Sequence, residues 1–151
     1  MIELDNIDRA LLRALQDDGS ARASDLGRVV GLSQPAAWRR IKRLETGGVI
    51  KGRRALLDAV KLGYGVTVFL GIKLAAKSGV SLEDFERAVS AIPEVQLVQH
   101  VLGMYDYRLK VVATDLSDFE RVLRRRIMTL PGVGDVEANV LLSEEKRGFA
   151  I

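Results

Sequence analysis

The sequence predicts an α+β fold, with an N-terminal three-helix, winged-helix-like unit containing a helix-turn-helix and a C-terminal ferredoxin-like βαββαβ unit. Near the N-terminus, a helical pattern with a basic face follows a turn that contains glycine, at residues 31–50. Further along, two similar helical segments are each flanked by strand patterns, which is the order of the split βαβ motif. The predicted boundaries are 1–50 for the first unit, 51–63 for a linker with a short strand, and 64–151 for the second unit.

The composition limits the class of protein. The chain has 151 residues, 48% of them hydrophobic, and no cysteine. It is therefore expected to be globular, without disulfides, thiolate metal sites or cysteine nucleophiles. No segment approaches the roughly 18 consecutive apolar residues of a membrane-spanning helix, and the first residues lack the pattern of a signal peptide. We therefore expect a cytoplasmic protein.

The formal net charge of +3 is unevenly distributed along the chain. Residues 1–54 contain eleven Lys or Arg and seven Asp or Glu, whereas residues 55–151 contain twelve and thirteen. Between Ser33 and Arg54 there are seven basic residues and a single acidic one, Glu45. A local basic patch on a nearly neutral chain is typical of proteins that bind phosphate groups.

Two helices are predicted before the basic one. Asp5 is a candidate N-cap for a helix whose apolar stripe begins at Ile7. A turn at residues 17–20 separates it from a short helix at about 24–30. Residues 31–33 then form a three-residue turn into the basic helix. Two helices joined in this way, the second of them basic, are the pattern of a helix-turn-helix.

The stretch GLSQPAAWRRIKRLETGGVI contains the predicted recognition helix. Ser33 is a good N-cap, and Ala37, Ile41 and Leu44 recur at helical spacing and form the buried face. The other face carries amide and guanidinium groups, which suit adenine and guanine in the DNA major groove. The alternative for this helix taken alone is an ordinary amphipathic helix with a solvated cationic face.

The second half of the sequence contains a repeat. LEDFERAVSAIPEV at residues 82–95 and LSDFERVLRRRIMTLPGV at 116–133 both place phenylalanine and aliphatic residues on one helical face. Each begins with a predicted capping box, Ser81 with Asp84 and Ser117 with Glu120. Right-handed crossovers would place both helices on one face of an antiparallel sheet. The four predicted strands are 66–74, 95–102, 107–113 and 136–142.

The predicted strands are apolar on both faces. Phe69, for example, has the opposite parity to Val68 and Leu70. A sheet with one side in water should alternate more cleanly. We expect a second copy of the same sheet to cover this face in a twofold homodimer, and the alternative is cover by the chain's own linker. A dimer would place two recognition helices about one helical turn of DNA apart.

Together these features resemble the Lrp/AsnC family of leucine-responsive and asparagine regulators, also called feast/famine proteins. The landmarks are LDNIDRALLRALQ near the N-terminus, the 31–50 stretch, LG at 62–63, GMYDYRLKV at 103–111 and LPGV at 130–133. The resemblance covers nearly the whole chain. It implies a transcription regulator with a small ligand-binding domain that responds to an amino acid or related metabolite. It also implies homodimers that assemble further, to tetramers or octamers.

The predicted contacts with double-stranded DNA combine this resemblance with the basic residues of the linker. Trp38 is expected against a thymine methyl group or a sugar edge, and the alternative is that it covers the edge of the core. The linker cations are expected to bind phosphates, which position a protein without specifying sequence, and the alternative is a solvated linker. The DNA-binding set is Ser33, Gln34, Pro35, Ala36, Trp38, Arg39, Arg40, Lys42, Arg43, Lys51, Arg53 and Arg54.

The predicted effector-binding residues are Gly103, Met104, Tyr105 and Asp106, which match the family's loop between the second and third strands. The resemblance implies that this loop lines a cleft where dimers meet. A glycine allows close approach of a ligand to the backbone, and the Asp106 carboxylate suits an α-ammonium group. The alternative is a hairpin turn in which the aspartate bonds to its own backbone.

The sequence departs from the family's pattern in two places, at the start of the second helix and at Gly27. Ser20 and Arg22 stand where the family usually has arginine and a capping serine, so Ser24 is expected to cap the second helix one turn later. Gly27 replaces a helix former and should cost up to about 1 kcal/mol relative to alanine. Neither change removes a predicted DNA contact.

Other functions are less well supported by the sequence. His100 is the only histidine and is expected on the sheet surface, so we expect no catalytic residue, metal ligand or cofactor. Some relatives of similar layout are tetrapyrrole decarboxylases, which leaves an enzyme as one alternative. A ligand-binding or assembly module without DNA binding is the other. RNA binding is disfavoured because the aromatic residues form no stacking surface on the strands.

Overall fold

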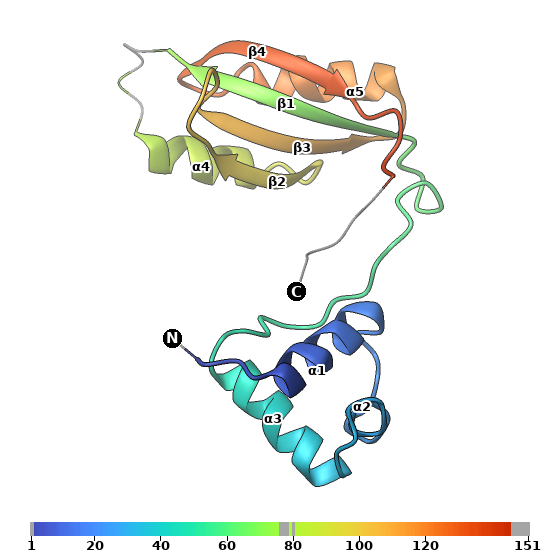
Figure 1. Ribbon diagram of the computed structural model, residues 1–151. Helices are drawn as coiled ribbons and strands as arrows, with labels where there is room; N and C mark the ends of the chain where they lie inside the picture. Colours follow the sequence, from blue (N-terminus) through green and yellow to red (C-terminus); the bar gives the residue numbers. More distant parts are fainter. Residues whose placement is uncertain (1, 76–78, 80, 146–151) are drawn as a thin grey trace. The chain divides into compact units, whose positions relative to one another are not determined.

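The computed structural model describes residues 2–75, 79 and 81–145. These residues fall into two compact units, one extending to Leu56 and the other beginning at Leu57. The first unit is helical, and the second combines a sheet with helices (Figure 1). Among the described residues, no helix is long and apolar enough to cross a membrane.

Three helices build the first unit, namely α1 (Asn6–Asp17), α2 (Ala23–Val30) and α3 (Gln34–Thr46). Leu11, Leu26 and Ile41, one from each helix, form the centre of its hydrophobic core. Each comes from the apolar stripe that helical spacing predicts. The predicted three-helix arrangement with a helix-turn-helix is therefore confirmed.

The N-caps of α1 and α3 are the predicted residues. The Asp5 side chain accepts a hydrogen bond from the backbone N–H of Asp8 at 2.7 Å. The Ser33 hydroxyl accepts one from the backbone N–H of Ala36 at 3.4 Å. These bonds satisfy amide groups that have no partner inside the helix, so the local sequence sets where both helices begin.

The start of α2 differs from the prediction. The helix begins at Ala23, and Ser24, the expected cap, lies inside its first turn. The carbonyl of Arg22 already accepts a hydrogen bond from the N–H of Leu26 at 3.0 Å, so the helix has started before Ser24 can cap it. At the other end, Gly31 adopts the left-handed conformation with φ 71°, which glycine accommodates without steric cost.

The short strand predicted within residues 51–63 is absent, and this segment contains turns without strand. A strand needs a partner for its backbone groups, and the described strands all pair within the sheet of the second unit. Leu56 and Leu57 in the linker are 86% and 74% exposed.

The second unit is a four-stranded antiparallel sheet with helices on one face (Figure 1). Its strands are ordered β2-β3-β1-β4, as expected for the ferredoxin-like βαββαβ layout. In chain order, the elements are β1 (Val66–Leu74), α4 (Leu82–Ser90), β2 (Val95–His100), β3 (Tyr107–Ala113), α5 (Leu116–Val122), the π-helix η1 (Leu123–Ile127) and β4 (Val133–Val140).

Several boundaries in this unit differ from the prediction. Strand β2 ends at His100, two residues early, and β4 spans Val133–Val140 instead of 136–142. Helix α4 is capped by Ser81 as predicted. Helix α5 is capped by Asp115 and not by Ser117, because the Asp115 side chain accepts the N–H of Asp118 at 2.8 Å.

The hydrophobic core of the second unit lies between the sheet and the two helices. Val68 and Leu70 of β1 and Leu109 of β3 are buried there against Phe85 of α4 and Phe119 of α5. Side chains of the opposite parity point to the other side of the sheet, as alternation along a strand requires. We call that side the open face, because the described helices of the second unit pack on the opposite side of the sheet.

The open face is part apolar and part charged. Leu97 and Val101 are 38% and 37% exposed on it, while Arg108 and Lys110 occupy the alternate positions of β3. The guanidinium carbon of Arg108 lies 5.1 Å from the centroid of the Phe69 ring. The face is therefore amphipathic, which the apolar strand patterns alone did not indicate.

Candidate nucleic-acid interface and ligand pocket

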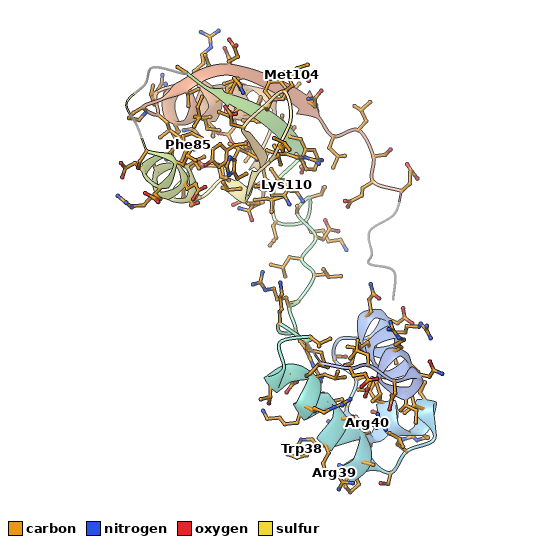
Figure 2. The ribbon with its side chains drawn as sticks, turned by 60° about the vertical axis from the view of Figure 1, so that its left-hand side comes forward. Trp38, Arg39, Arg40, Phe85, Met104 and Lys110 are labelled. Carbon is orange, nitrogen blue, oxygen red and sulfur yellow. The ribbon has the colours of Figure 1, made fainter. Side chains whose placement is uncertain are left out.

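Helix α3 presents a buried face and an outer face. Ala37, Ile41 and Leu44 are buried, and at 100° per residue Arg39 lies on the side opposite to Ala37. Trp38 is 57% exposed, and Figure 2 shows Trp38 and Arg39 extending away from the helix. Among the described residues, Arg39 has no ion-pair partner, so its charge is available to a ligand.

Most of the other predicted DNA-binding residues are also on the surface. Trp38, Arg39 and Lys42 line an open hollow of about 510 Å³ on the outer side of α3. Ala36 and Arg40 are only partly exposed. The exposed members of the set are Ser33, Gln34, Pro35, Trp38, Arg39, Lys42, Arg43, Lys51, Arg53 and Arg54.

Arg40 occupies a different position from Arg39. Its Nη1 atom donates to a carboxylate oxygen of Asp5 at 2.6 Å and to one of Asp8 at 2.9 Å. The side chain is 29% exposed, and Figure 2 shows it on a different side of α3 from Arg39. Arg40 therefore links α3 to the start of α1, which removes it from the outer face of the helix.

Asp8 is the anion around which this link is built. Its side chain is 1% exposed and accepts from both Arg40 and Arg43. Burial raises the pKa of Asp8, but hydrogen bonds from Arg43 and Arg40 outweigh it and hold the pKa below its ordinary value. Removing either the carboxylate or a guanidinium partner from a buried ion pair strongly destabilises the fold. Asp8 therefore fixes α3 against α1.

Arg53 is held by the first unit. Its Nη1 atom donates to the carbonyl oxygens of Ala21 at 3.2 Å and Gly19 at 3.4 Å, and its Nη2 atom lies 3.8 Å from Glu45. Lys51 and Arg54 make no ion pair within the described residues. Of the three linker cations, these two have the freer charges.

In the second unit, three of the predicted effector residues line one cavity. Gly103, Met104 and Tyr105 border a hollow of about 410 Å³ on the open face, together with Phe69 and Arg108. This volume is within the range of small-molecule sites. The cavity combines mainly apolar walls with the Arg108 guanidinium and the Asn139 amide.

Tyr105 forms one side of this cavity by lying against Gly71 of β1. A Cβ atom at Gly71 would come within 2.6 Å of the Tyr105 ring, so only glycine allows the ring to lie there. The Tyr105 hydroxyl donates to Glu137 of β4. This hydrogen bond raises the pKa of Tyr105 and lowers that of Glu137.

Asp106 does not line the cavity. One carboxylate oxygen accepts from Lys73 Nζ at 2.8 Å, and the other accepts from the backbone N–H of Leu74 at 2.8 Å. The hydrogen bond from Lys73 is the main reason why the pKa of Asp106 is lowered. The Asp106 side chain therefore does not bond to its own backbone, as the hairpin alternative expected. It bonds to the neighbouring strand, where Asp106 extends the pairing of β3 with β1.

Both units match known families. Residues 4–45 match the AsnC-type helix-turn-helix domain, and residues 67–151 match the Lrp/AsnC ligand binding domain. The chain belongs to the Lrp/AsnC family.

Relatives in this family are transcription regulators. The chain is 35% identical over 143 residues to the DNA-binding transcriptional activator DecR of Escherichia coli (strain K12), covering 95% of this chain and 94% of DecR. It is 37% identical to the leucine-responsive regulatory protein of Haemophilus influenzae over 144 residues, or 95% of this chain and 87% of the relative.

Solved structures of transcription regulators have the same fold. An AsnC family transcriptional regulator from Agrobacterium tumefaciens superposes with a TM-score of 0.86 at 36% identity, covering 98% and 96% of the two chains. A transcriptional regulator from Neisseria meningitidis in complex with L-methionine gives a TM-score of 0.90 at 28% identity, covering 99% and 96%.

The sequence prediction for this Lrp/AsnC chain missed the role of Asp8. From the sequence, Asp8 was given no role in binding arginine, but its side chain is the buried partner of two arginines. A signal was present in the spacing of α3. Arg40 is only about 60° around the helix from Ala37, too close to the buried face for a freely solvated cation.

Proposed function

We propose that this Lrp/AsnC protein is a sequence-specific transcription regulator that inserts α3 into the DNA major groove. The observation that carries the proposal is the outer face of α3, where Arg39 and Lys42 are exposed opposite the buried residues. Arginine suits guanine, and the amide of Gln34 suits adenine. A recognition helix contacts bases with its N-terminal residues, and Gln34 and Arg39 lie in that half of α3.

Backbone contacts are assigned to the cations that the fold does not engage. Lys51 and Arg54 are the proposed phosphate contacts from the linker. Arg53 is also close enough in sequence to contribute, but its bonds to Gly19 and Ala21 favour a role in positioning the linker. Arg40 is proposed to support α3 through Asp5 and Asp8 instead of touching DNA.

The second domain is the proposed effector-binding and assembly domain. We assign residues 1–50 to DNA binding, 51–63 to the linker and 64–151 to the effector domain, with the effector in the cavity beside Tyr105. An amino acid or related metabolite is the proposed effector class. It can change DNA binding only to the extent that it binds one conformation or assembly better than another.

A second copy of the chain is the proposed cover for the open face, giving a homodimer. Phe69, Leu97 and Val101 supply apolar area there, and Arg108 and Lys110 share the face with Glu137. In a twofold dimer the same surface patch of both copies forms the interface. The apolar and charged groups of one open face would therefore meet the open face of the second copy. Further assembly to a tetramer or octamer belongs to the proposal. A cytoplasmic location also belongs to the proposal, because the protein needs access to the chromosome in order to bind DNA.

The experiment that tests the proposal is a gel shift with DNA from upstream of the protein's own gene. It is run at fixed salt, since DNA affinity depends steeply on salt, with and without a pool of amino acids. Arg39→Ala is compared with Arg9→Ala, a matched loss of an exposed arginine on α1. We expect a specific shift that the pool alters and that Arg39→Ala weakens.

Failure has a defined meaning. If neither this DNA nor other promoter fragments gives a specific shift, the ligand-binding module without DNA binding replaces the regulator. The regulators reported above favour regulation over the tetrapyrrole decarboxylase alternative. Haem-type absorbance of the purified protein, followed by turnover of a tetrapyrrole carboxylate, would reverse that preference.

A further inference from the structure

Two opposite charges share one row of the open face. Gly71 of β1 pairs with Arg108 of β3 on one side and with Glu137 of β4 on the other. Residues directly opposite each other in a sheet point to the same face. Because neighbouring strands are about 4.8 Å apart, the two charged residues are about 10 Å apart along the row. The Tyr105 ring lies against Gly71, between the two charges.

Neither charge is compensated within one copy of the chain. Among the described residues, Arg108 and Glu137 form no ion pair. Glu137 accepts hydrogen bonds from neutral groups, the Tyr105 hydroxyl and Asn139 Nδ2 at 3.0 Å. The guanidinium carbon of Arg108 lies 5.1 Å from the centroid of the Phe69 ring. Both groups are exposed and held in place, so each is available to a partner of opposite charge.

Neighbouring positions extend the same division of charge. Lys110 adds a second cation on β3, and it forms no ion pair within the described part of the chain. On β4, the hydrogen bond to Glu137 is the main reason why the pKa of Tyr105 is raised, and the charge of Asp135 contributes. The β3 side of the open face is therefore positive, and the β4 side is negative.

This division distinguishes two ways of packing a second copy face to face. A twofold axis along β1 places β3 of each copy over β4 of the other, so that Arg108 meets Glu137 of the partner subunit. An axis across the strands places β3 over β3, and like charges then oppose association. Packed sheets lie about 10 Å apart, a gap that an arginine and a glutamate together can span. Both charges lie about 5 Å from an axis along β1, so the small rotation between aligned sheets keeps them opposed.

We propose that Arg108 and Glu137 select a second copy of the chain and set its orientation. Arg108 of each copy pairs with Glu137 of the partner subunit, across a twofold axis that runs along β1. The inference rests on the homodimer of the proposed function and adds the residues that choose the partner. Twofold symmetry forms the pair twice in each dimer. A chain with another arrangement of charge on this face would meet like or unpaired charges and is rejected.

Charge reversal in the full-length protein tests this pairing. Arg108→Glu would set carboxylates against each other in a homodimer, and Glu137→Arg would do the same with guanidinium groups. We expect each variant to raise the dimer Kd about tenfold or more at low salt, measured by sedimentation equilibrium. The double variant again has opposite charges face to face and should recover most of the affinity. Arg125→Glu, on the exposed side of η1, is the control and should leave the Kd unchanged.

The two single variants should also bind each other. In the mixed dimer, both facing pairs combine a carboxylate with a guanidinium group. Hexahistidine-tagged Arg108→Glu should therefore retain untagged Glu137→Arg on nickel resin. Neither variant should retain another copy of itself under the same conditions.

Two results overturn the inference. One is that the folded single variants dimerise like the wild type, and the other is that the double variant stays as weak as the singles. If a reversed variant does not fold, Arg108→Gln and Glu137→Gln replace the pair. Residues that contact each other are coupled, so the double glutamine variant should weaken dimerisation less than the two single effects combined. Fully additive effects would contradict the pairing.

This test separates the inference from the proposed function. A wild-type dimer that charge reversal leaves intact keeps the homodimer and contradicts the pairing. A chain that follows the charge-reversal pattern but never shifts DNA supports the pairing and contradicts the regulator.

Discussion

Asp8 divides the arginines of α3 by what each of them contacts. Arg40 is bonded to Asp5 and Asp8, Arg43 shares Asp8, and Arg39 has no acidic partner among the described residues. All three were predicted as DNA contacts because they match the recognition-helix region of the family. Residue type indicates what a side chain is able to bind, while its angle around the helix and its neighbours decide what it does bind.

Arg39→Ala and Arg40→Ala should therefore differ in kind. Arg39→Ala should weaken specific DNA binding by about 1–3 kcal/mol, with no change in thermal stability. Arg40→Ala should lower the melting temperature, because it leaves Asp8 with one partner fewer. Fluorescence anisotropy at fixed salt and thermal denaturation measure the two effects. A stable Arg40→Ala protein with weakened DNA binding would return Arg40 to the interface.

Asp8→Asn should destabilise the first unit by about 3 kcal/mol. This is the lower end of the stability loss expected when one member of a buried ion pair is removed, because Arg43 is half exposed. Trp38 is the only tryptophan and belongs to this unit, so its fluorescence during urea denaturation reports the loss. Asp17→Asn, at the last residue of α1 and exposed, is the matched control and should have almost no effect.

The same carboxylates make the first unit sensitive to acid. Burial raises the pKa of Asp8, but its bonds to Arg43 and Arg40 lower it overall, and the Asp8 N–H and then Arg40 lower the pKa of Asp5. A carboxyl group with a folded-state pKa below its unfolded value stabilises the fold above that unfolded value and loses this contribution as pH falls through the folded pKa.

We therefore expect the free energy of unfolding to decline below about pH 4, where unfolded aspartates begin to protonate. Trp38 fluorescence in urea measured at several pH values follows the decline. Asp8→Asn should make it shallower, since the variant has no carboxylate to protonate there. An equally steep decline in the variant would move the acid sensitivity to other groups.

At the scale of elements, periodicity predicted more than caps did. The positions of β1 and β3 and the three helices of the first unit follow from apolar spacing that the fold preserves. The predicted caps of α2 and α5 were wrong: α2 begins without a side-chain cap, and at α5 Asp115 takes the place expected for Ser117. The π-helix Leu123–Ile127 had no signal in the spacing.

Helix α5 offers a direct test of which residue caps it. Asp115→Ala should destabilise the second unit by about 1 kcal/mol, the usual loss for an N-cap, because the N–H of Asp118 loses its acceptor. Ser117→Ala, the cap expected from the sequence, should be close to neutral. Thermal denaturation of both variants makes the comparison. A larger loss in Ser117→Ala would restore the predicted capping box.

At the scale of the whole molecule, the sequence identified the open face as needing cover but not what it carries. The expectation of a sandwich between two sheets came from apolar residues at both parities. The charged positions Arg108 and Lys110 and the cavity beside Tyr105 depend on register and on the packing of a ring against Gly71. Such features come from tertiary contacts that no local pattern contains. In the proposed function, this face serves ligand binding as well as assembly.

Leu97→Asp tests the proposed homodimer. An aspartate at this partly exposed position on the open face should remain solvated in a single copy, but burial against a second copy would desolvate its charge without a partner. We expect sedimentation velocity to show the variant as a monomer where the wild type is a dimer or larger. Because two recognition helices then no longer act on one DNA molecule, the variant should also lose most of its affinity for a two-half-site fragment. Leu116→Asp makes the same change at the exposed first residue of α5 and should keep both the assembly and the affinity. If Leu97→Asp assembles like the wild type, the dimer uses another surface, and the open face serves the ligand alone.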